Sequence, residues 1–213
     1  MKIEYFGHSC FRISSENGVK IVTDPYTKVG YELPADLTAD IVALSHGHFD
    51  HNHLTGVNGV KTVLDKAGNY TASGIPFEGI TTDHDPVGGA LRGKNIVFKM
   101  TVDGTVVCHM GDIGERCTEK LLAAIGKVDV LLIPVGGTYT IDAEQAYEYV
   151  RKINPRIAIP MHYKPRDGAL DIASADGFLN LFGTVYAKKK GVCVPSETEP
   201  LSEKTKIVFM ERV

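Results

Sequence analysis

Four of the eight histidines in the chain lie within nine residues, in the stretch SHGHFDHNH at residues 45–53. His46, His48, Asp50 and His51 form the pattern HxHxDH, which joins neutral imidazoles to a carboxylate. Imidazole nitrogens suit zinc and other first-row metals, and a carboxylate adds a harder oxygen ligand. Because four adjacent ligands cannot all reach one ion with good angles, the pattern favours two ions that share this stretch.

Other loops must supply the remaining ligands. The candidates are His84 in TTDHDP, Asp112 in HMGDIG and His162 in PMHYK, and each follows a predicted strand. Strands of a layered sheet end at shared edges, where the loops that follow them meet. Together with the HxHxDH pattern, these three residues predict a set of seven metal ligands.

The elements around these residues predict a layered α/β domain. The expected strands occupy residues 2–6, 10–14, the segment after the Asn17-Gly18 turn, and 40–45, which is apolar enough to be covered on both faces. Residues 60–110 are expected to be mostly strands, with a hairpin turn at Asp103-Gly104. Thereafter helices in 118–126, 142–153 and 173–182 alternate with strands in 128–137, 156–163 and 204–213. The basic run YAKKKG at 186–191 is expected to be a solvated turn.

Length and composition are those of an ordinary globular protein, with 213 residues, 43% hydrophobic and 23% charged. We expect a single domain over residues 1–213. A net charge of −3 gives no sign of a nucleic-acid or membrane partner, and no apolar run approaches the length of a membrane span. We therefore expect a cytoplasmic protein. Cys10, Cys108, Cys117 and Cys193 are far apart and form no CxxC pair, which favours small buried side chains over a structural zinc site.

A family resemblance follows from these motifs. HxHxDH after a strand, a downstream His, Gly-Asp after a hairpin and a final His after a strand resemble the metallo-β-lactamase superfamily, from Asp24 to His162. The segments YFGHSCFRI, TDP and PMHY are similar to one branch, the small metal-dependent hydrolases that resemble ascorbate-6-phosphate lactonases. The resemblance implies a four-layer αββα sandwich, more specific than the layered α/β domain that the residues alone predict.

The resemblance also implies roles for individual residues. It divides the ligands into two groups that share a bridging Asp112: His46, His48 and His84 for one ion, and Asp50, His51 and His162 for the other. Asp24, in VTDP, would accept a hydrogen bond from a ligand histidine and so orient its ring. Asp83 or Asp85 is a weaker candidate for the same role. Each ligand histidine needs such an acceptor for its other ring nitrogen.

The expected chemistry is hydrolysis by a hydroxide that two divalent ions hold, because such ions lower the pKa of bound water to about 7. Zinc is the default metal, and manganese or iron suit the same ligands. Asp112 would fix the metal separation and Asp50 would orient the hydroxide, so both are predicted catalytic carboxylates. Di-iron relatives resemble HxExDH, and antibiotic-hydrolysing relatives lack the bridging aspartate, so the sequence departs from both.

The expected substrate is a small-molecule phosphoester, lactone or related ester. A nuclease of the same fold and a non-catalytic metal-binding module are the alternatives, and the absence of a basic stripe weakens the nuclease. The oligomeric state stays open.

For some further residues the sequence leaves open whether they act at the metal site or only stabilise the fold. His8 in GHSCF, Tyr139 in VGGTYT, and Tyr163 and Lys164 after His162 are candidates for contact with substrate or for support of the ligands. His53 is expected to face solvent or to cap a helix. His109 is expected to support the loop before Asp112.

Overall fold

One sheet is built mainly from the N-terminal part of the chain. The computed structural model describes residues 1–183, 186–190, 192–193 and 205–213. The strands of this six-stranded sheet, in spatial order, are β13 (Val192–Cys193), β1 (Lys2–Gly7), β2 (Cys10–Ser14), β3 (Lys20–Thr23), β4 (Ile41–Ala43) and β5 (Thr62–Leu64). The β2–β3 hairpin turns at the predicted Asn17-Gly18, where Gly18 has a φ of 88°. Strand β4 is parallel to β3 and β5 and is buried throughout, as its apolar sequence predicts.

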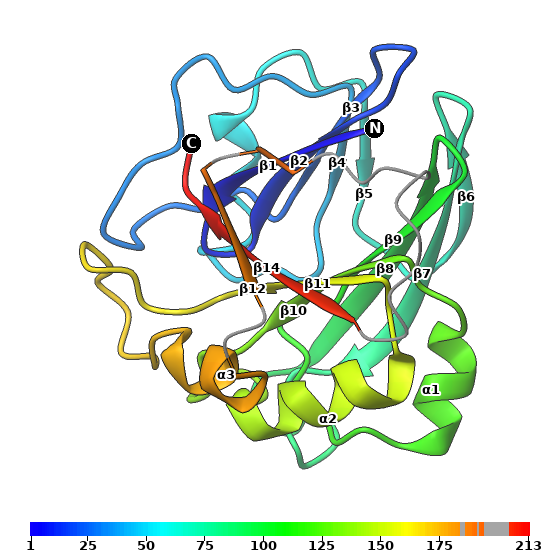
Figure 1. Cartoon of the computed structure of the whole chain (residues 1–213). Helices are drawn as coiled ribbons and strands as arrows, with labels where there is room; N and C mark the ends of the chain where they lie inside the picture. The colour runs from blue at the N-terminus through cyan, green and yellow to red at the C-terminus, as the bar shows by residue number, and fades with distance from the viewer. Residues whose placement is uncertain (184–185, 191, 194–204) are drawn as a thin grey trace.

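A second, eight-stranded sheet packs against the first (Figure 1). Its strands, in spatial order, are β12 (Tyr186–Lys190), β14 (Lys206–Glu211), β11 (Ile157–Met161), β10 (Val130–Pro134), β9 (Thr105–His109), β8 (Lys94–Val102), β7 (Ile75–Asp83) and β6 (Gly68–Ala72). Strands β6 to β9 are antiparallel, and β9, β10, β11, β14 and β12 are parallel. Asp103 and Gly104 both have positive φ at the β8–β9 turn, the geometry that favours Asp-Gly in tight hairpins.

Three helices cover one face of the eight-stranded sheet: α1 (Glu119–Ile125), α2 (Ala143–Ile153) and α3 (Asp176–Leu181) (Figure 1). Helix α2 begins at the predicted capping box, in which Asp142 accepts from the backbone of Gln145 and Gln145 returns the bond. It buries Ala146, Tyr149 and Val150 on one side. No helix in the described ranges is both long and apolar enough to cross a membrane.

Among the described residues, loops rather than α-helices cover the other face of the six-stranded sheet. A second apolar cluster lies there, in which Phe6 and Val22 from the strands meet Tyr26 and Leu37 from the β3–β4 connection. A short 3₁₀ helix, η1 (Leu54–Gly56), adjoins this cluster. The β3–β4 connection contains two prolines and one glycine, which disfavour a helix, so this outer layer is irregular.

The strands and helices expected from the sequence are present, with one correction. The solvated turn predicted for YAKKKG is wrong, because Tyr186–Lys190 form β12, which pairs with β14 at the edge of the larger sheet. A row of lysines is typical of edge strands as well as of turns, since lysine deters further strand pairing. Sequence composition alone therefore could not separate the two.

Candidate metal centre

All seven predicted ligands lie on loops that follow strands. The HxHxDH stretch follows β4, His84 follows β7, Asp112 follows β9 and His162 follows β11. These four loops meet at one edge where the two sheets face each other. The β1–β2 turn brings His8 to the same place, and Asp24 directly follows β3.

Two groups of ligand atoms share no residue, and a third group of His46, His51 and Asp112 links them. In one group, the imidazole nitrogens of His46, His48 and His84 all lie within 4.8 Å of one another. In the other, single donor atoms of His8, Asp50, His51 and His162 meet the same limit. Each group offers at least three donors, enough to begin the coordination of a divalent ion.

Asp112 lies between the two groups and is almost completely buried. Its Oδ2 atom faces the Nε2 atoms of four histidines, at 3.1 Å from His51, 3.2 Å from His162, 3.5 Å from His84 and 3.9 Å from His46. His46 and His84 belong to one group, and His51 and His162 to the other. One carboxylate oxygen thus faces both groups at once, which is the arrangement that a bridging ligand requires.

The turn that presents Asp112 is fixed by Asn95 and His109. The Asn95 side chain accepts from the Asp112 N–H at 2.9 Å and donates to the Met110 carbonyl at 2.9 Å. His109 accepts from the Gly111 N–H at 3.1 Å, so it does support this loop. Gly111 has a φ of 55°, and a Cβ there would lie 2.2 Å from the Asn95 side-chain oxygen, so only glycine fits. Asn95 lies within β8, and no motif in the strand pattern predicts its role.

Asp24 connects histidines of both groups. Its carboxylate accepts from the Ser45 N–H at 2.7 Å and the Ser45 hydroxyl at 2.6 Å, and lies 2.9 Å from Nδ1 of His51. The Ser45 hydroxyl lies 2.9 Å from Nδ1 of His46. Asp24 therefore orients His51 directly and His46 through Ser45, and it leaves the Nε2 atom of each ring to face Asp112. Ser45 is a supporting residue that the motif analysis did not single out.

The buried charges set the protonation of the histidines. Burial alone would lower the pKa of His51, but the carboxylates of Asp112 and Asp24 raise it well above its ordinary value. Burial alone would raise the Asp112 pKa, but the surrounding histidines hold it well below its ordinary value. Burial lowers the pKa of His8 to about 4 and of His46 to about 3, and neighbouring histidines add to both shifts. The imidazoles of His8 and His46 are therefore neutral at pH 7, and a histidine must be neutral to bind a metal ion.

Several buried polar atoms of the centre have no hydrogen-bond partner in the described residues. These are Nε2 of His46, Nδ1 of His84, Oδ1 of Asp112 and both ring nitrogens of His162. Buried polar atoms are almost always paired, so this concentration calls for a ligand. Imidazoles grouped around carboxylates are a suitable donor set for divalent first-row metals, and the residues present fit such ions.

A cleft of about 340 Å³ opens beside the centre. Its lining combines predicted ligands with residues of other loops: His48, Phe49, Asp50, His84, Arg92, Asp112, Tyr139 and Leu170. Tyr139 was expected near the cleft and does line it. Arg92 also lines the cleft, although its glycine-containing loop carries no motif that predicts this position.

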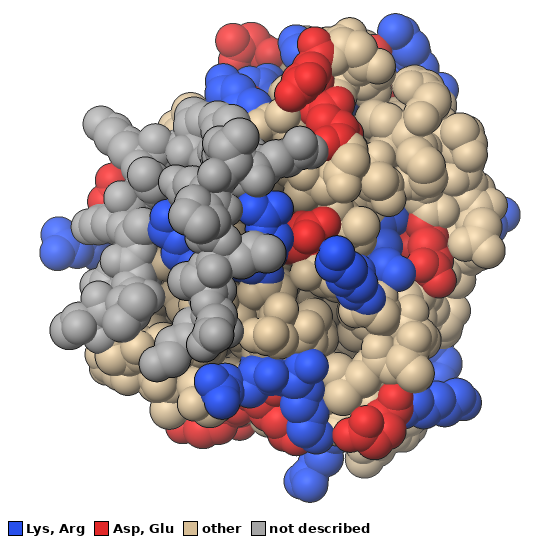
Figure 2. Space-filling view, turned by 45° about the vertical axis from the view of Figure 1, so that its right-hand side comes forward, with Lys and Arg blue, Asp and Glu red and all other residues tan. Residues whose placement is uncertain are grey.

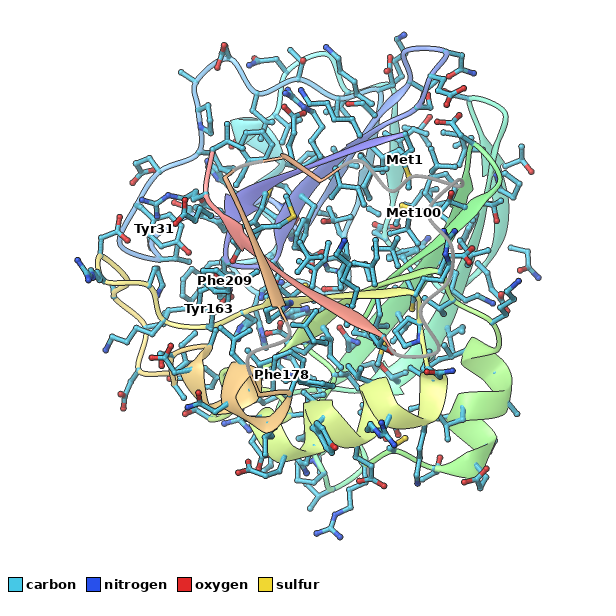
Figure 3. The ribbon with its side chains drawn as sticks, in the orientation of Figure 1. Met1, Tyr31, Met100, Tyr163, Phe178 and Phe209 are labelled. Atoms are coloured by element: carbon cyan, nitrogen blue, oxygen red, sulfur yellow. The ribbon has the colours of Figure 1, made fainter. Side chains whose placement is uncertain are left out.

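Two other predicted substrate residues do not line this cleft. Tyr163 is buried, donates from its hydroxyl to the Met210 carbonyl at 3.3 Å and lies beside Phe209 (Figure 3). Lys164 is exposed and borders separate cavities. The backbone of His162 is left-handed, with a φ of 50°. Sequence adjacency to His162 does not bring these two side chains into the cleft, and their role toward the substrate stays a prediction.

The weaker supporting candidates also lie elsewhere. Asp83 pairs with Lys94, and the Asp85 carboxylate accepts backbone N–H groups of its own loop. Among the described residues, neither carboxylate contacts a ring nitrogen of a predicted ligand. Of the three aspartates, only Asp24 therefore orients a ligand histidine. His53 occupies the first capping position of η1 and belongs to neither group of donors.

Family comparison agrees with this geometry. A model of the beta-lactamase superfamily domain matches residues 2–162, which is most of the chain. The chain therefore belongs to this superfamily, and the predicted metallo-β-lactamase-like α/β sandwich is confirmed.

Individual relatives narrow the placement. A UPF0173 metal-dependent hydrolase of Carboxydothermus hydrogenoformans is 31% identical over 194 residues, which cover 76% of this chain and 84% of the relative. Another UPF0173 metal-dependent hydrolase, from Thermoplasma acidophilum, is 29% identical, and the match covers 94% of this chain and 98% of the relative. The chain is also similar to a solved structure from Thermotoga maritima, described as a proposed Zn-dependent hydrolase of the metallo-beta-lactamase superfamily. The TM-score is 0.78 and the sequence identity 39%, and the match covers 98% of this chain and 97% of the other. The chain thus belongs with the UPF0173 metal-dependent hydrolases; the closer likeness to ascorbate-6-phosphate lactonases stays a prediction.

Proposed function

We propose that this protein is a metal-dependent hydrolase with a two-ion centre, which acts on a small-molecule phosphoester, lactone or related ester. The observation that carries the proposal is the position of Asp112, whose Oδ2 faces histidines of both donor groups within 3.9 Å. In this assignment the first ion is held by His46, His48 and His84, the second by Asp50, His51 and His162, and Asp112 belongs to both.

Zinc is the metal we propose, with manganese or iron as alternatives, and two such ions supply an activated water near neutral pH and polarise the bond under attack. The chain's own groups have separate tasks. Asp112 and Asp50 would supply the oxygen donors, and Asp50, which lines the cleft, would also orient the hydroxide. Tyr139, which also lines the cleft and is 37% exposed, can donate its hydroxyl proton to the leaving oxygen.

A small substrate suits the cleft, because about 340 Å³ is near the lower end of the range for small-molecule sites. The nuclease alternative would need a basic track for a phosphate backbone. On the face shown in Figure 2, basic side chains are interspersed with acidic and uncharged ones. Arg92 is the one Lys or Arg among the described residues that line the cleft. The nuclease is therefore the less favoured alternative.

Metal analysis followed by an activity panel tests the proposal. We expect the purified protein to bind two equivalents of divalent metal per chain and to hydrolyse at least one member of a panel of phosphodiesters, lactones and thioesters. Chelation should abolish the activity and added zinc or manganese should restore it. Asp112→Asn should lower kcat by at least about a hundredfold, whereas the control His53→Ala should leave it unchanged.

The outcomes separate the candidate functions. If the protein binds no divalent metal, the proposal fails. If it binds metal but hydrolyses nothing in the panel, a non-catalytic metal-binding module becomes the better account. If it cleaves RNA or DNA in a salt-sensitive manner and leaves small esters intact, the nuclease is correct.

A further inference from the structure

Arg92 lines the cleft and has no acidic partner in the described part of the chain. No carboxylate there lies within ion-pair distance of its guanidinium, which instead sits 5.3 Å from the centre of the Tyr139 ring. By contrast, the nearby Lys94 is paired with Asp83. A half-buried guanidinium that faces a cleft without a carboxylate is available to a negatively charged ligand.

The loop that carries Arg92 is held in one conformation by Asp85. Both oxygens of this buried carboxylate accept backbone N–H groups of the loop: those of Val87 and Gly89 at 2.9 Å each, Leu91 at 2.9 Å and Arg92 at 2.8 Å. The loop is closed further by the bond from the Gly93 N–H to the Gly89 carbonyl. Asp85 directly follows His84, so the position of Arg92 is tied to the donor groups at one end and to this network at the other. Such an arrangement preorganises a recognition residue.

Exposed apolar side chains line the cleft and also occur on the loop that carries Arg92. Phe49 is 51% exposed and Tyr139 is 37% exposed, and both line the cleft. Val87 and Leu91, at 55% and 71%, are on the loop of Arg92. The other exposed large hydrophobic side chains of the described residues are Val63, Leu181 and Val213. Four of these seven side chains therefore belong to the cleft or to the loop that carries Arg92. Exposed apolar side chains gathered at a polar opening are typical of ligand-binding surfaces.

We propose that the substrate is an anionic amphipath. In this assignment its scissile bond meets the donor groups, an anionic group outside that bond, such as a carboxylate, phosphate or sulfate, pairs with Arg92, and an apolar portion packs on Phe49 and Tyr139. Arg92 is thus a specificity-determining residue. The assignment rests on the proposed hydrolase function, and it excludes neutral esters and lactones as preferred substrates.

Matched substrates test the kinetic consequence. Mono(4-nitrophenyl) glutarate and 4-nitrophenyl pentanoate differ in that a terminal carboxylate replaces a methyl group. The metal-loaded wild type should have a lower KM for the glutarate. Arg92→Gln should raise that KM by at least about tenfold, because a charged hydrogen-bond partner is lost, with kcat changed less than threefold and the pentanoate KM unchanged. Arg92→Lys should recover part of the affinity. Arg166→Gln removes an exposed charge that borders a separate cavity and should change neither KM.

A binding measurement gives a readout that does not depend on catalysis. The fluorescent probe 8-anilinonaphthalene-1-sulfonate is an anionic amphipath, and N-phenyl-1-naphthylamine has the same rings without the sulfonate. Arg92→Gln should weaken binding of the first probe alone by at least about tenfold, whereas Phe49→Ala should weaken binding of both.

The two measurements fail separately. If esters are hydrolysed but Arg92→Gln affects the charged and neutral compounds equally, the inference about the substrate is overturned and the hydrolase stands. If neither ester nor any other panel compound is hydrolysed, yet the sulfonate probe depends on Arg92, the hydrolase proposal fails and the anion-binding role of Arg92 is supported.

Discussion

The Nε2 atom of His8 lies 3.2 Å from Oδ2 of Asp50 and also 3.2 Å from Nε2 of His51. Such separations are ordinary between two ligands of one metal ion. His8 reaches this place because its backbone is left-handed, with a φ of 52°, and because its carbonyl accepts from the His162 N–H at 2.9 Å and the Tyr5 hydroxyl at 3.0 Å. The β1–β2 turn is thus fastened to the second donor group, and His8 either adds a ligand to that group or orients Asp50 within it.

For the proposed two-ion centre, either role predicts that His8 affects the affinity for one ion more than the affinity for the other. His8→Ala should weaken one of the two metal equivalents by about 10–100-fold, because the second group loses a donor or the hydrogen bond that orients Asp50. Titration against a chromophoric chelator measures the two affinities. The other equivalent, held by the group that contains His46, should be unchanged. His53→Ala is the matched control; equal weakening of both equivalents, or of neither, would contradict the prediction.

Substitution of Asp24 should lower both stability and metal affinity. Asp24→Asn keeps the size of the side chain and tolerates the left-handed φ of 39°. It cannot, however, accept all three hydrogen bonds from Ser45 and His51. We expect a loss of about 2–3 kcal/mol in the free energy of unfolding, measured by urea denaturation in the presence of chelator so that metal does not contribute.

A surface aspartate provides the control for this experiment. Asp36 is exposed, and Asp36→Asn should change the free energy of unfolding by less than about 0.5 kcal/mol. Equal stability of the Asp24→Asn and Asp36→Asn variants in chelator would show that the network behind the histidines contributes nothing to the fold.

Metal binding at pH 7 should release about one proton per chain from His51, and a water that the proposed ions hold with a pKa of about 7 adds to that number. The raised pKa of His51 keeps that imidazole protonated in the metal-free protein, and a ligand must be deprotonated. His8 and His46, with pKa values of about 4 and 3, are already neutral and release none. Calorimetric titration in two buffers of different ionisation enthalpy measures the number. Asp24→Asn removes one cause of the raised His51 pKa, so it should reduce the release, and identical heats in both buffers would refute the assignment.

Gly136 should be intolerant of a side chain. A Cβ at this position would lie 2.2 Å from the carbonyl oxygen of His162. Gly136→Ala should therefore displace His162, destabilise the chain by about 1–3 kcal/mol and weaken metal binding. Gly177→Ala is the matched control, because its Cβ would meet Ala143 at an ordinary 3.4 Å. Thermal unfolding and metal titration of the two variants provide the comparison, and equal behaviour would argue against close packing at His162.

Much of this architecture follows from local sequence. The alternation of apolar strands and capped helices, the Asn17-Gly18 and Asp103-Gly104 turns, and the capping box at Asp142 are short-range signals that the tertiary structure retains. The seven predicted ligands are also conspicuous locally, because histidines and aspartates directly after buried strands have no packing purpose. Their placement at strand ends was sufficient to predict that they converge.

Tertiary structure decided what surrounds those ligands. Local sequence could not show that Asn95 would hold Asp112, that Ser45 would link Asp24 to His46, or that Arg92 would line the cleft, because each relationship joins segments that meet only after the sheets pack. The same reason explains why Tyr163, which adjoins His162 in sequence, is buried outside the cleft. Residue type and spacing determined which side chains could bind metal, whereas the packing of the two sheets determined which other groups orient them and which line the cleft.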